Sequence, residues 1–435
     1  MPAPTTVSDI HAHVDHEVEL RGWLYNRRGS GKIAFLMLRD GTGIIQCIAS
    51  RAELDAVEEG LFDRLRKLGQ ESSLIVRGVV RAEERAPFCG HELHVTGAAV
   101  VAEANDYPIT KKEHGPAFLH DNRHLWFRSR RQQAILRVRH ATVKAIRDYF
   151  DSRDFLLLDS PILTANACEG TTTLFGTEYY GRMAYLAQSG QLYQEAGAAA
   201  FRKTYCFGPT FRAEKSDTRR HLTEFWMVEP EVAWIDFDEL MDLCEDFLVE
   251  ITGRVLEACR PHLLELERDV SALERVQKPF PRISYDEASD RVRAMGIAME
   301  PEDDFGAPQE TALADSYDRP ILVHRYPTAV KAFYMKEDPT NPRRCLGVDV
   351  LAPEGYGEII GAGQREDDLA VLERKITAHG LPMEAFRWYL DLRRYGTFPH
   401  GGFGLGLERT VGWLCGIHHI RECVPFPRTI DRLEP

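Results

Sequence analysis

The first hundred residues alternate apolar and polar positions over short runs, which is the period of half-buried β-strands. Five such runs lie between residues 17 and 102: VELRGWLY, KIAFLMLRD, GIIQCIAS, SLIVRGVVRAE and HELHVTGAAVV. A helical stretch, AELDAVEEGLFDRLRKLG, separates the third run from the fourth. Five short strands with one helix are typical of a small Greek-key barrel, and we therefore predict an OB-fold β-barrel domain over residues 1–104.

The pattern changes after the barrel. Residues 105–130 are polar and irregular, with charge and proline enough to predict a linker. From Gln132 apolar residues recur at helical spacing, and FLLLDSPIL then predicts a strand that ends at Pro161. The remainder mixes strands with amphipathic helices, so we predict an α+β domain over residues 131–435.

Composition limits the class of protein. A hydrophobic share of 44% over 435 residues supports at least one sizeable core. The nine cysteines are widely spaced, without a CxxC pair or a Cys/His cluster, which indicates reduced thiols rather than a structural zinc site. The N-terminus lacks the features of a signal peptide, and no run of about eighteen apolar residues follows, so we expect a cytoplasmic protein.

The charge is unevenly distributed. A net charge of −13 argues against a surface coated in basic patches. Between Leu20 and Met37, however, the barrel carries only basic charges and no acid: Arg21, Arg27, Arg28 and Lys32. One hairpin of an acidic protein is therefore basic, which is where a nucleic acid could bind.

The segment FRAEKSDTRRHLTEFWMVEPEVAW, residues 211–234, predicts an antiparallel hairpin with a polar tip. Residues two apart share a face of a strand, which puts Arg212 beside Glu214, and Phe225 on the same side as Glu229. This face is either a solvated surface with ion pairs or a concave site. An arginine, a glutamate and a phenylalanine together can bind a phosphate, an adenine amino group and an adenine ring.

Two further segments carry candidate chemistry. HGGFGLGLERTVGWLCG is dense in glycine and places Arg409 at the start of a helix, which indicates either a structural corner or a close approach to a ligand. It matches neither a P-loop nor a Rossmann fingerprint. In DVLAPEGYGEIIGAGQRE, Asp349 and Glu358 are candidate Mg²⁺ ligands or rim carboxylates. The stretches CEGTTTLF and LAQSGQLYQE add Glu169, Ser189 and Gln191.

In this order the segments resemble the class II aminoacyl-tRNA synthetases, in the subgroup for aspartate, asparagine and lysine. The helix and strand that end in SPIL match the family's first motif, FRAE with the following strand the second, and GGFGLGLERT the third. The resemblance covers nearly the whole chain. It implies an anticodon-binding OB barrel and a catalytic antiparallel sheet flanked by helices, with a helical insertion at about residues 236–320. It also implies a homodimer formed through the first motif.

The resemblance assigns roles around ATP. Arg212 is expected to hold the α-phosphate and the substrate carboxylate, and Arg409 one adenine face and the γ-phosphate; both are expected to be catalytic. Glu214 would meet the adenine amino group, Phe225 the other adenine face, and His221 the γ-phosphate. Asp349 and Glu358 match the family's Mg²⁺ ligands, and Glu358 also contacts ATP, although extra residues separate the pair compared with the aspartyl pattern.

In the barrel, Phe35 and Gln46 match positions where an aromatic side chain stacks on an anticodon base and an amide binds it. Arg27 is nearby. Stacking on splayed bases beside a basic hairpin is a usual way to bind single-stranded loops. Core packing is the alternative role for Phe35.

The amino-acid pocket favours asparagine over aspartate. Aspartyl enzymes read PQLYKQ where this chain reads SGQLYQE, so a lysine that meets the substrate carboxylate is replaced by the neutral Gln194. Glu229 stands where those enzymes carry a shorter acid, and it can accept from an amide while Arg365 donates to the amide oxygen. We expect Glu169, Ser189 and Gln191 around the substrate ammonium.

The expected substrates are therefore L-asparagine, ATP with Mg²⁺, and the tRNA for asparagine. Two alternatives remain open. One is an aspartyl enzyme that charges both tRNAs, which Gln194 and Glu229 oppose. The other is an ATP-dependent asparagine synthetase on the same catalytic core, which would leave the basic barrel without a role.

Overall fold

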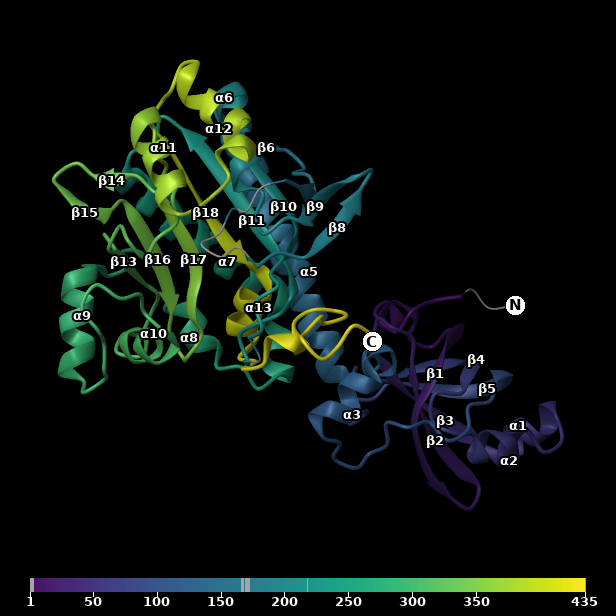
Figure 1. The fold of residues 1–435 in the computed structure, drawn as a ribbon. Helices are drawn as coiled ribbons and strands as arrows, with labels where there is room; N and C mark the ends of the chain where they lie inside the picture. The colour runs from purple at the N-terminus through teal and green to yellow at the C-terminus, as the bar shows by residue number, and fades with distance from the viewer. Residues whose placement is uncertain (1–3, 166–167, 169–172, 217, 435) are drawn as a thin grey trace. The chain divides into compact units, whose positions relative to one another are not determined.

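The computed structural model describes residues 4–165, 168, 173–216 and 218–434 (Figure 1). Contacts divide the chain into two compact units, Met1–Asn122 and Arg123–Pro435. The division falls inside the stretch that the sequence predicts to be a linker. Helix α3 (Pro116–Asp121) ends the first unit, and α4 (Arg123–Trp126) begins the second.

The first unit is a closed five-stranded barrel, as predicted, with strand order β1-β2-β3-β5-β4. Its strands are β1 (Glu17–Ser30), β2 (Ile33–Arg39), β3 (Ile44–Ser50), β4 (Ser73–Ala82) and β5 (His91–Ala102). The short 3-10 helix η1 (Ile10–His13) precedes the barrel, and α1 (Arg51–Val57) and α2 (Leu61–Lys67) connect β3 to β4. Leucine, isoleucine and valine side chains from all five strands fill the interior, which confirms the OB fold.

The second unit is built on an eight-stranded sheet with order β12-β13-β16-β17-β18-β11-β10-β6. The strands are β12 (Arg282–Ser284), β13 (Ile321–His324), β16 (Gly347–Ala352), β17 (Gly357–Gln364), β18 (His400–Gly406), β11 (Glu224–Ala233), β10 (Lys203–Phe211) and β6 (Leu156–Leu157). Neighbouring strands are antiparallel except at the two edges, where β12–β13 and β10–β6 are parallel. This confirms the expected α+β domain.

Helices cover both faces of the sheet. On one face α5 (Arg130–Asp151), α7 (Phe237–Glu265) and α13 (Leu407–Cys415) bury their apolar sides together with Val228 and Val232 of β11. Glu229 and Glu231, which alternate with these valines along β11, point to the opposite face, where α6 (Gln191–Phe201) lies. The period-2 pattern of β11 thus separates a hydrophobic core from a charged face.

Smaller elements complete this unit. A three-stranded sheet, in the order β7-β9-β8, is formed by β7 (Leu163–Thr164), β8 (Gly176–Tyr179) and β9 (Arg182–Leu186). The other elements are β14 (Glu337–Asp338), β15 (Asn341–Cys345), α8 (Val270–Glu274), α9 (Tyr285–Ala294), α10 (Ala307–Ala314), α11 (Leu369–Ala378), α12 (Arg387–Arg394), η2 (Met383–Phe386) and η3 (Ile420–Glu422). Over 236–320, where the resemblance implies a helical insertion, α7 packs on the main sheet and β12 extends its edge. Among the described residues no helix is both long and apolar enough to span a bilayer.

Candidate active site

The charged hairpin is formed by β10 and β11, paired in register from Lys203↔Val232 to Phe211↔Glu224. Cys206 lies opposite Glu229, and Thr204 opposite Glu231, so the acids of β11 share one side of the sheet. Beyond the last ladder pair, the Arg212 N–H donates to the Thr223 carbonyl at 3.0 Å. This contact holds the FRAE segment against the returning strand.

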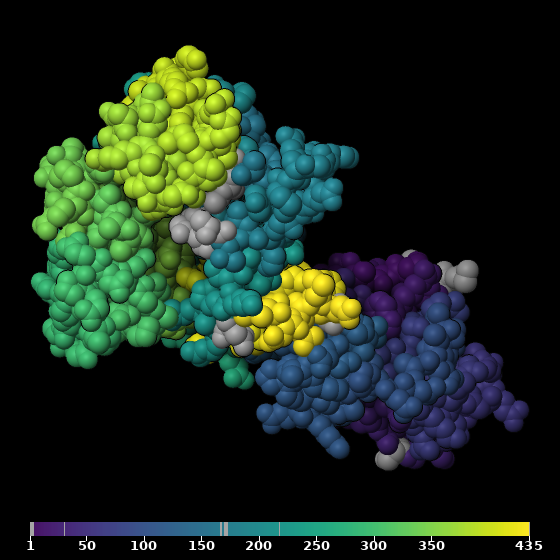
Figure 2. Space-filling model, viewed as in Figure 1, coloured from purple at the N-terminus to yellow at the C-terminus, as the bar shows by residue number. Residues whose placement is uncertain are grey.

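A cavity of about 460 Å³ opens between the hairpin, β17 and the start of α13. In Figure 2 the surface of this unit is hollowed between its teal and green segments. The cavity is lined by all six residues that the resemblance assigns to ATP: Arg212, Glu214, His221, Phe225, Glu358 and Arg409. Segments separated by up to about half of the chain are therefore brought to one site.

The cavity is strongly cationic at one end. The Arg212 guanidinium lies 5.5 Å from the centre of the Phe225 ring, and Arg409 donates to the Glu358 carbonyl. Burial, together with the nearby Arg409 and Arg212 guanidiniums, lowers the pKa of His221. Positive charge, one aromatic face and a glutamate carboxylate suit a nucleotide with several phosphates.

The two candidate metal ligands lie on neighbouring antiparallel strands, Asp349 on β16 and Glu358 on β17. A Cβ atom at Gly361 would lie 2.8 Å from Glu358 Oε1, so a larger residue would displace this carboxylate, whereas Asp349 Oδ1, at 3.9 Å, would stay at an ordinary contact distance. Lys331 Nζ lies 2.8 Å from Asp349 Oδ2 and 3.6 Å from Asp304 Oδ1. Within the described ranges no three His, Cys, Asp or Glu side chains form a metal cluster. Two carboxylates nevertheless fit Mg²⁺, which usually takes one or two from the protein and the rest from phosphate and water.

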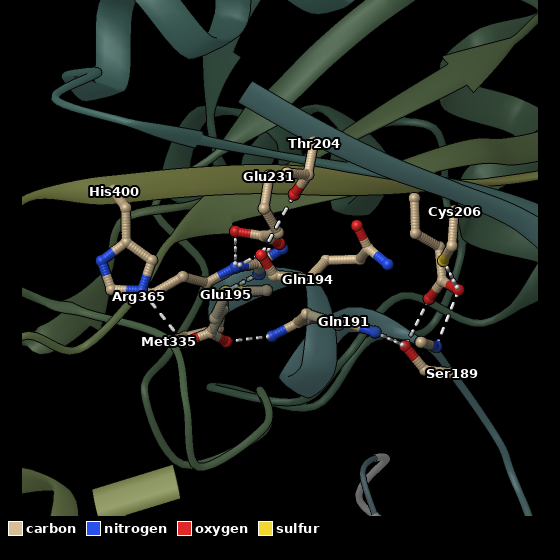
Figure 3. Close-up of polar contacts among 12 residues, drawn as sticks. Ser189, Gln191, Gln194, Glu195, Thr204, Cys206, Glu231, Met335, Arg365 and His400 are labelled. Atoms are coloured by element: carbon tan, nitrogen blue, oxygen red, sulfur yellow. Dashed lines mark hydrogen bonds and ion pairs between the residues drawn. The ribbon is translucent and has the colours of Figure 1, made fainter. Parts of the chain in front are cut away.

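Glu229 lies on the charged face of β11 and is 4% exposed, so it does not face solvent. Its carboxylate accepts from the Ser189 hydroxyl, from the Gly190 N–H at 2.8 Å and from the Cys206 thiol at 3.4 Å. Two of these donors, Ser189 and Cys206, lie close together near the start of α6 (Figure 3). Two predicted residues of the amino-acid site, Ser189 and Glu229, are thus in direct contact.

Arg365 pairs with Glu231, a contact that the sequence analysis did not predict. Its Nε donates to Glu231 Oε1 at 3.0 Å and its terminal nitrogen makes a second contact with the same carboxylate (Figure 3). Both side chains are almost completely buried. Its other terminal nitrogen lies 3.9 Å from Met335 Sδ, and the Tyr334 ring centre is 5.3 Å from the guanidinium. Glu231, which sequence reasoning left without a role, follows Glu229 by one strand period.

Gln194 and Glu195 point to different neighbours. The Gln194 amide donates to the Leu158 carbonyl at 2.8 Å and to Ser160 Oγ at 3.0 Å. Glu195, which sequence reasoning did not assign, accepts from the Gln191 amide at 3.1 Å. The remaining predicted residue of the amino-acid site, Glu169, lies outside the described residues.

In the barrel, the structure changes the choice of arginine. Arg27 donates to the Leu68 carbonyl at 2.7 Å and to other carbonyls at the end of α2, so it caps that helix. Arg28 instead lies 5.2 Å from the centre of the half-buried Phe35 ring and donates to Gln46 Oε1 at 3.0 Å. Arg28, rather than the predicted Arg27, therefore contacts Phe35 and Gln46, and the anticodon role of Arg27 stays a prediction.

Gln46 is also more constrained than the sequence suggested. It is 4% exposed, and its amide nitrogen donates to Glu92 Oε1 at 2.6 Å while its oxygen accepts from Arg28. Arg28, Phe35, Gln46 and Glu92 thus form a connected polar and aromatic surface on neighbouring strands. A nucleotide base could stack on it and exchange hydrogen bonds with it.

Comparisons with known proteins agree with this geometry. The family model described as tRNA synthetases class II (D, K and N) matches residues 116–430, and the OB-fold nucleic acid binding domain matches residues 18–101. An "Asparagine--tRNA ligase" of Sorangium cellulosum is 59% identical over 98% of both chains, and one of Desulforamulus reducens 54% over 99%. A crystal structure of asparaginyl-tRNA synthetase from Pyrococcus horikoshii complexed with asparaginyl-adenylate is 43% identical. It covers 99% of both chains with a TM-score of 0.96.

The matched ranges include the whole barrel, the charged hairpin and the glycine-rich strand. The identity extends over nearly the full length of the relatives, so both domains are shared rather than one borrowed module. The chain belongs to the class II tRNA synthetases of the aspartate, lysine and asparagine group.

Proposed function

We propose that the chain is an asparagine–tRNA ligase, which activates L-asparagine with ATP and transfers it to the terminal ribose of the tRNA for asparagine. The observation that carries this function is the joining of two sites. The cationic nucleotide cavity and the proposed asparagine-binding residues Glu229 and Arg365 lie on strand β11 and its neighbours. The relatives named "Asparagine--tRNA ligase" support the same activity.

In the first step the asparagine carboxylate attacks the α-phosphorus of ATP, giving asparaginyl-adenylate and pyrophosphate. Arg212 would hold the attacking carboxylate and the α-phosphate together, so the reacting atoms are in line before reaction. Arg409 would stabilise the charge that moves to the departing phosphates. The ribose hydroxyl of the tRNA then attacks the adenylate carbonyl, and AMP leaves.

Asp349 and Glu358 would hold the Mg²⁺ that accompanies ATP. When bound there, the ion neutralises phosphate charge during transfer. Lys331 lies 2.8 Å from Asp349 and 3.6 Å from Asp304, so its charge compensates both carboxylates in the absence of ATP.

Selectivity for asparagine follows from a donor and an acceptor. Glu229 would accept from the substrate amide nitrogen, and Arg365, fixed by Glu231, would donate to the amide oxygen. Aspartate would instead place a second carboxylate against Glu229 in a poorly solvated pocket, which is strongly unfavourable. Sites of this type discriminate by roughly 10⁴-fold.

ATP–pyrophosphate exchange tests the substrate directly. We expect exchange that depends on L-asparagine and is at least about 10³-fold less efficient with L-aspartate. Equal exchange with both amino acids would identify the non-discriminating aspartyl alternative. Asparagine formation from aspartate and ammonia without tRNA would identify the asparagine synthetase alternative.

The barrel should act on the tRNA and not on the adenylate. We expect Phe35→Ala and Arg28→Ala to raise the KM for tRNA by about tenfold or more, since stacking on one base contributes about 1–3 kcal/mol. Asparagine-dependent exchange should stay within about twofold of the unmodified protein, because the substituted side chains lie in the other compact unit. Arg81→Ala, an exposed arginine paired with Asp15 on the same barrel, is the matched control. A large loss of exchange in the Phe35 variant would contradict the anticodon role.

We further propose a homodimer through the first motif, in the cytoplasm. Large apolar side chains are exposed on the segment around SPIL and the small sheet that follows it: Ile162, Leu163, Phe175, Tyr179, Tyr180 and Met183. An exposed apolar group of this size supports association with a second copy. All nine cysteines, each within the described residues, are free thiols, which supports a reducing compartment.

A further inference from the structure

Glu195 is a buried carboxylate of α6 that joins three elements around the amino-acid pocket. It accepts from the Tyr389 hydroxyl at 2.8 Å, from the Arg393 guanidinium at 2.7 Å and from His400 Nε2 at 3.0 Å. These partners come from α12 and β18, and its side chain is 0% exposed. On the fourth side it accepts from the amide of Gln191 (Figure 3).

We propose that Glu195 is a specificity-determining residue that excludes aspartate from the amino-acid pocket. This inference rests on the proposed function and adds a residue that does not touch the substrate. Glu195 has two effects: it cancels positive charge behind the pocket, which acts against aspartate, and it fixes the orientation of Gln191, which acts on the ammonium that both amino acids share.

The first effect is electrostatic. Burial alone would raise the pKa of Glu195, but Arg393 and the hydrogen bond from His400 lower it well below the usual range, so the carboxylate is ionised. Two buried guanidiniums of this region are each matched by a carboxylate, Arg365 by Glu231 and Arg393 by Glu195. The neutral side-chain amide of asparagine needs no cation in order to bind in such a site. The side-chain carboxylate of aspartate would find no uncompensated cation to pair with, so its binding is unfavourable.

The second effect is geometric. A carboxylate can only accept hydrogen bonds, so Glu195 requires that the amide nitrogen of Gln191 faces it. The amide oxygen of Gln191 is then the end that accepts from a donor such as the substrate ammonium. A neutral glutamine at position 195 could either donate or accept, and it would leave both orientations of Gln191 open.

The test is the ratio of kcat/KM for asparagine to kcat/KM for aspartate in ATP–pyrophosphate exchange. We expect Glu195→Gln to lower this ratio by at least about tenfold, with part of the change a gain for aspartate, because a compensated charge near the pocket becomes uncompensated. Glu195→Asp, which keeps the charge, should hold the ratio within about threefold even where activity falls. If both amino acids lose activity in parallel in Glu195→Gln, Glu195 is only structural and the proposal is overturned.

Glu245→Gln is the matched control. Glu245 is also buried and pairs with an arginine, Arg282 at 2.7 Å, but it lies on α7 on the opposite face of the sheet. We expect Glu245→Gln to leave the ratio of kcat/KM for asparagine to kcat/KM for aspartate unchanged. A ratio that falls equally in Glu245→Gln would show that any lost buried carboxylate has this effect, which would also overturn the proposal.

Should Glu195→Gln not fold, the double variant Glu195→Gln with Arg393→Gln carries the test. This double variant removes both charges of the buried pair, and replacing both partners together often leaves the stability of the folded protein nearly unchanged. A ratio within about threefold of the unmodified protein supports the charge argument, and a tenfold fall in it contradicts that argument. An unmodified protein that does not activate asparagine would refute the proposed function itself, before any variant is compared.

Discussion

Arg212→Ala lowers asparagine-dependent ATP–pyrophosphate exchange by about 10³-fold or more, because one guanidinium serves two reacting groups. Removing a single donor that stabilises developing charge commonly costs about 10²–10³ in kcat. The variant also lacks the guanidinium that holds the substrate carboxylate, so the attacking oxygen is no longer aligned with the α-phosphorus. The measurement is kcat and KM for ATP and for asparagine in the exchange reaction.

The matched control for this variant is Arg147→Ala. Arg147 belongs to α5, and its guanidinium lies 5.7 Å from the ring centre of Phe207. It therefore contacts β10, the strand that directly precedes Arg212, without lining the cavity. We expect exchange within about threefold of the unmodified protein for this surface change. Retention of more than a tenth of the activity by Arg212→Ala, with unchanged KM values, would mean that Arg212 does not hold the α-phosphate.

Much of the nucleotide site could be predicted because its pattern is local. The alternation in EFWMVEPE fixes which side chains of β11 share a face, and it places Phe225 and Glu229 on the side away from Val228 and Val232. Arg409 is fixed in the same way by its position at the start of a helix that follows a glycine-rich strand. The order of the three motifs along the chain then indicates that these local patterns belong to one site.

The glycines of β18 show how such a local pattern serves packing. A Cβ atom at Gly402 would lie 2.1 Å from the Pro230 carbonyl oxygen and 2.4 Å from Glu231 Oε1. Only glycine allows β18 to approach β11 this closely above a buried carboxylate. The density of glycine was visible in the sequence, but the carboxylate that requires it at this position was not.

The partners of buried charges could not be read from spacing. Arg365 and Glu231 are 134 residues apart, and Arg393 and Glu195 are 198 residues apart, so only the folded sheet brings each pair together. The pairing of Arg365 with Glu231, which the sequence analysis did not predict, is of this kind. Glu229 and Glu231 share a face of β11, and strand alternation alone does not show which of them meets an arginine.

The sequence analysis named Arg27 near Phe35, whereas Arg28 is the arginine that contacts this ring, and the reason lies in the register of β1. The register between β1 and β2 shifts between Leu24 and Asn26, which is a β-bulge or a similar irregularity. A shift of one residue moves every later side chain to the other face of a strand. Arg28 is consequently paired with Phe35, while Arg27 reaches the end of α2.

Arg365→Leu should show the largest combined loss of stability and activity. Both partners of the Arg365–Glu231 pair are almost completely buried. Removing one partner leaves a buried charge without compensation, which destabilises by about 3–5 kcal/mol. The same change removes the donor to the asparagine amide oxygen, so kcat/KM for asparagine should fall by about 10²-fold or more. Urea unfolding and the exchange assay measure the two effects separately.

The double variant Arg365→Leu with Glu231→Leu separates the two losses. Replacing both members of a buried pair by apolar residues is often neutral for stability, so we expect unfolding close to that of the unmodified protein while exchange stays low. If the double variant is as unstable as Arg365→Leu, the unpaired carboxylate is not the cause of the instability. If its exchange recovers with its stability, Arg365 has no direct role in binding the amide.

The instability of Arg365→Leu should also depend on pH, with a sign that follows from Glu231. Burial raises the pKa of Glu231, and the Arg365 guanidinium opposes this shift. Without Arg365 the folded protein holds a proton on Glu231 that the unfolded chain releases at lower pH. A group whose pKa is raised in the folded state stabilises it below the unfolded value and loses that contribution as pH rises. The variant should therefore be least destabilised in mild acid and progressively less stable toward neutral and alkaline pH, whereas the double variant should lack this dependence because it has no carboxyl group at position 231.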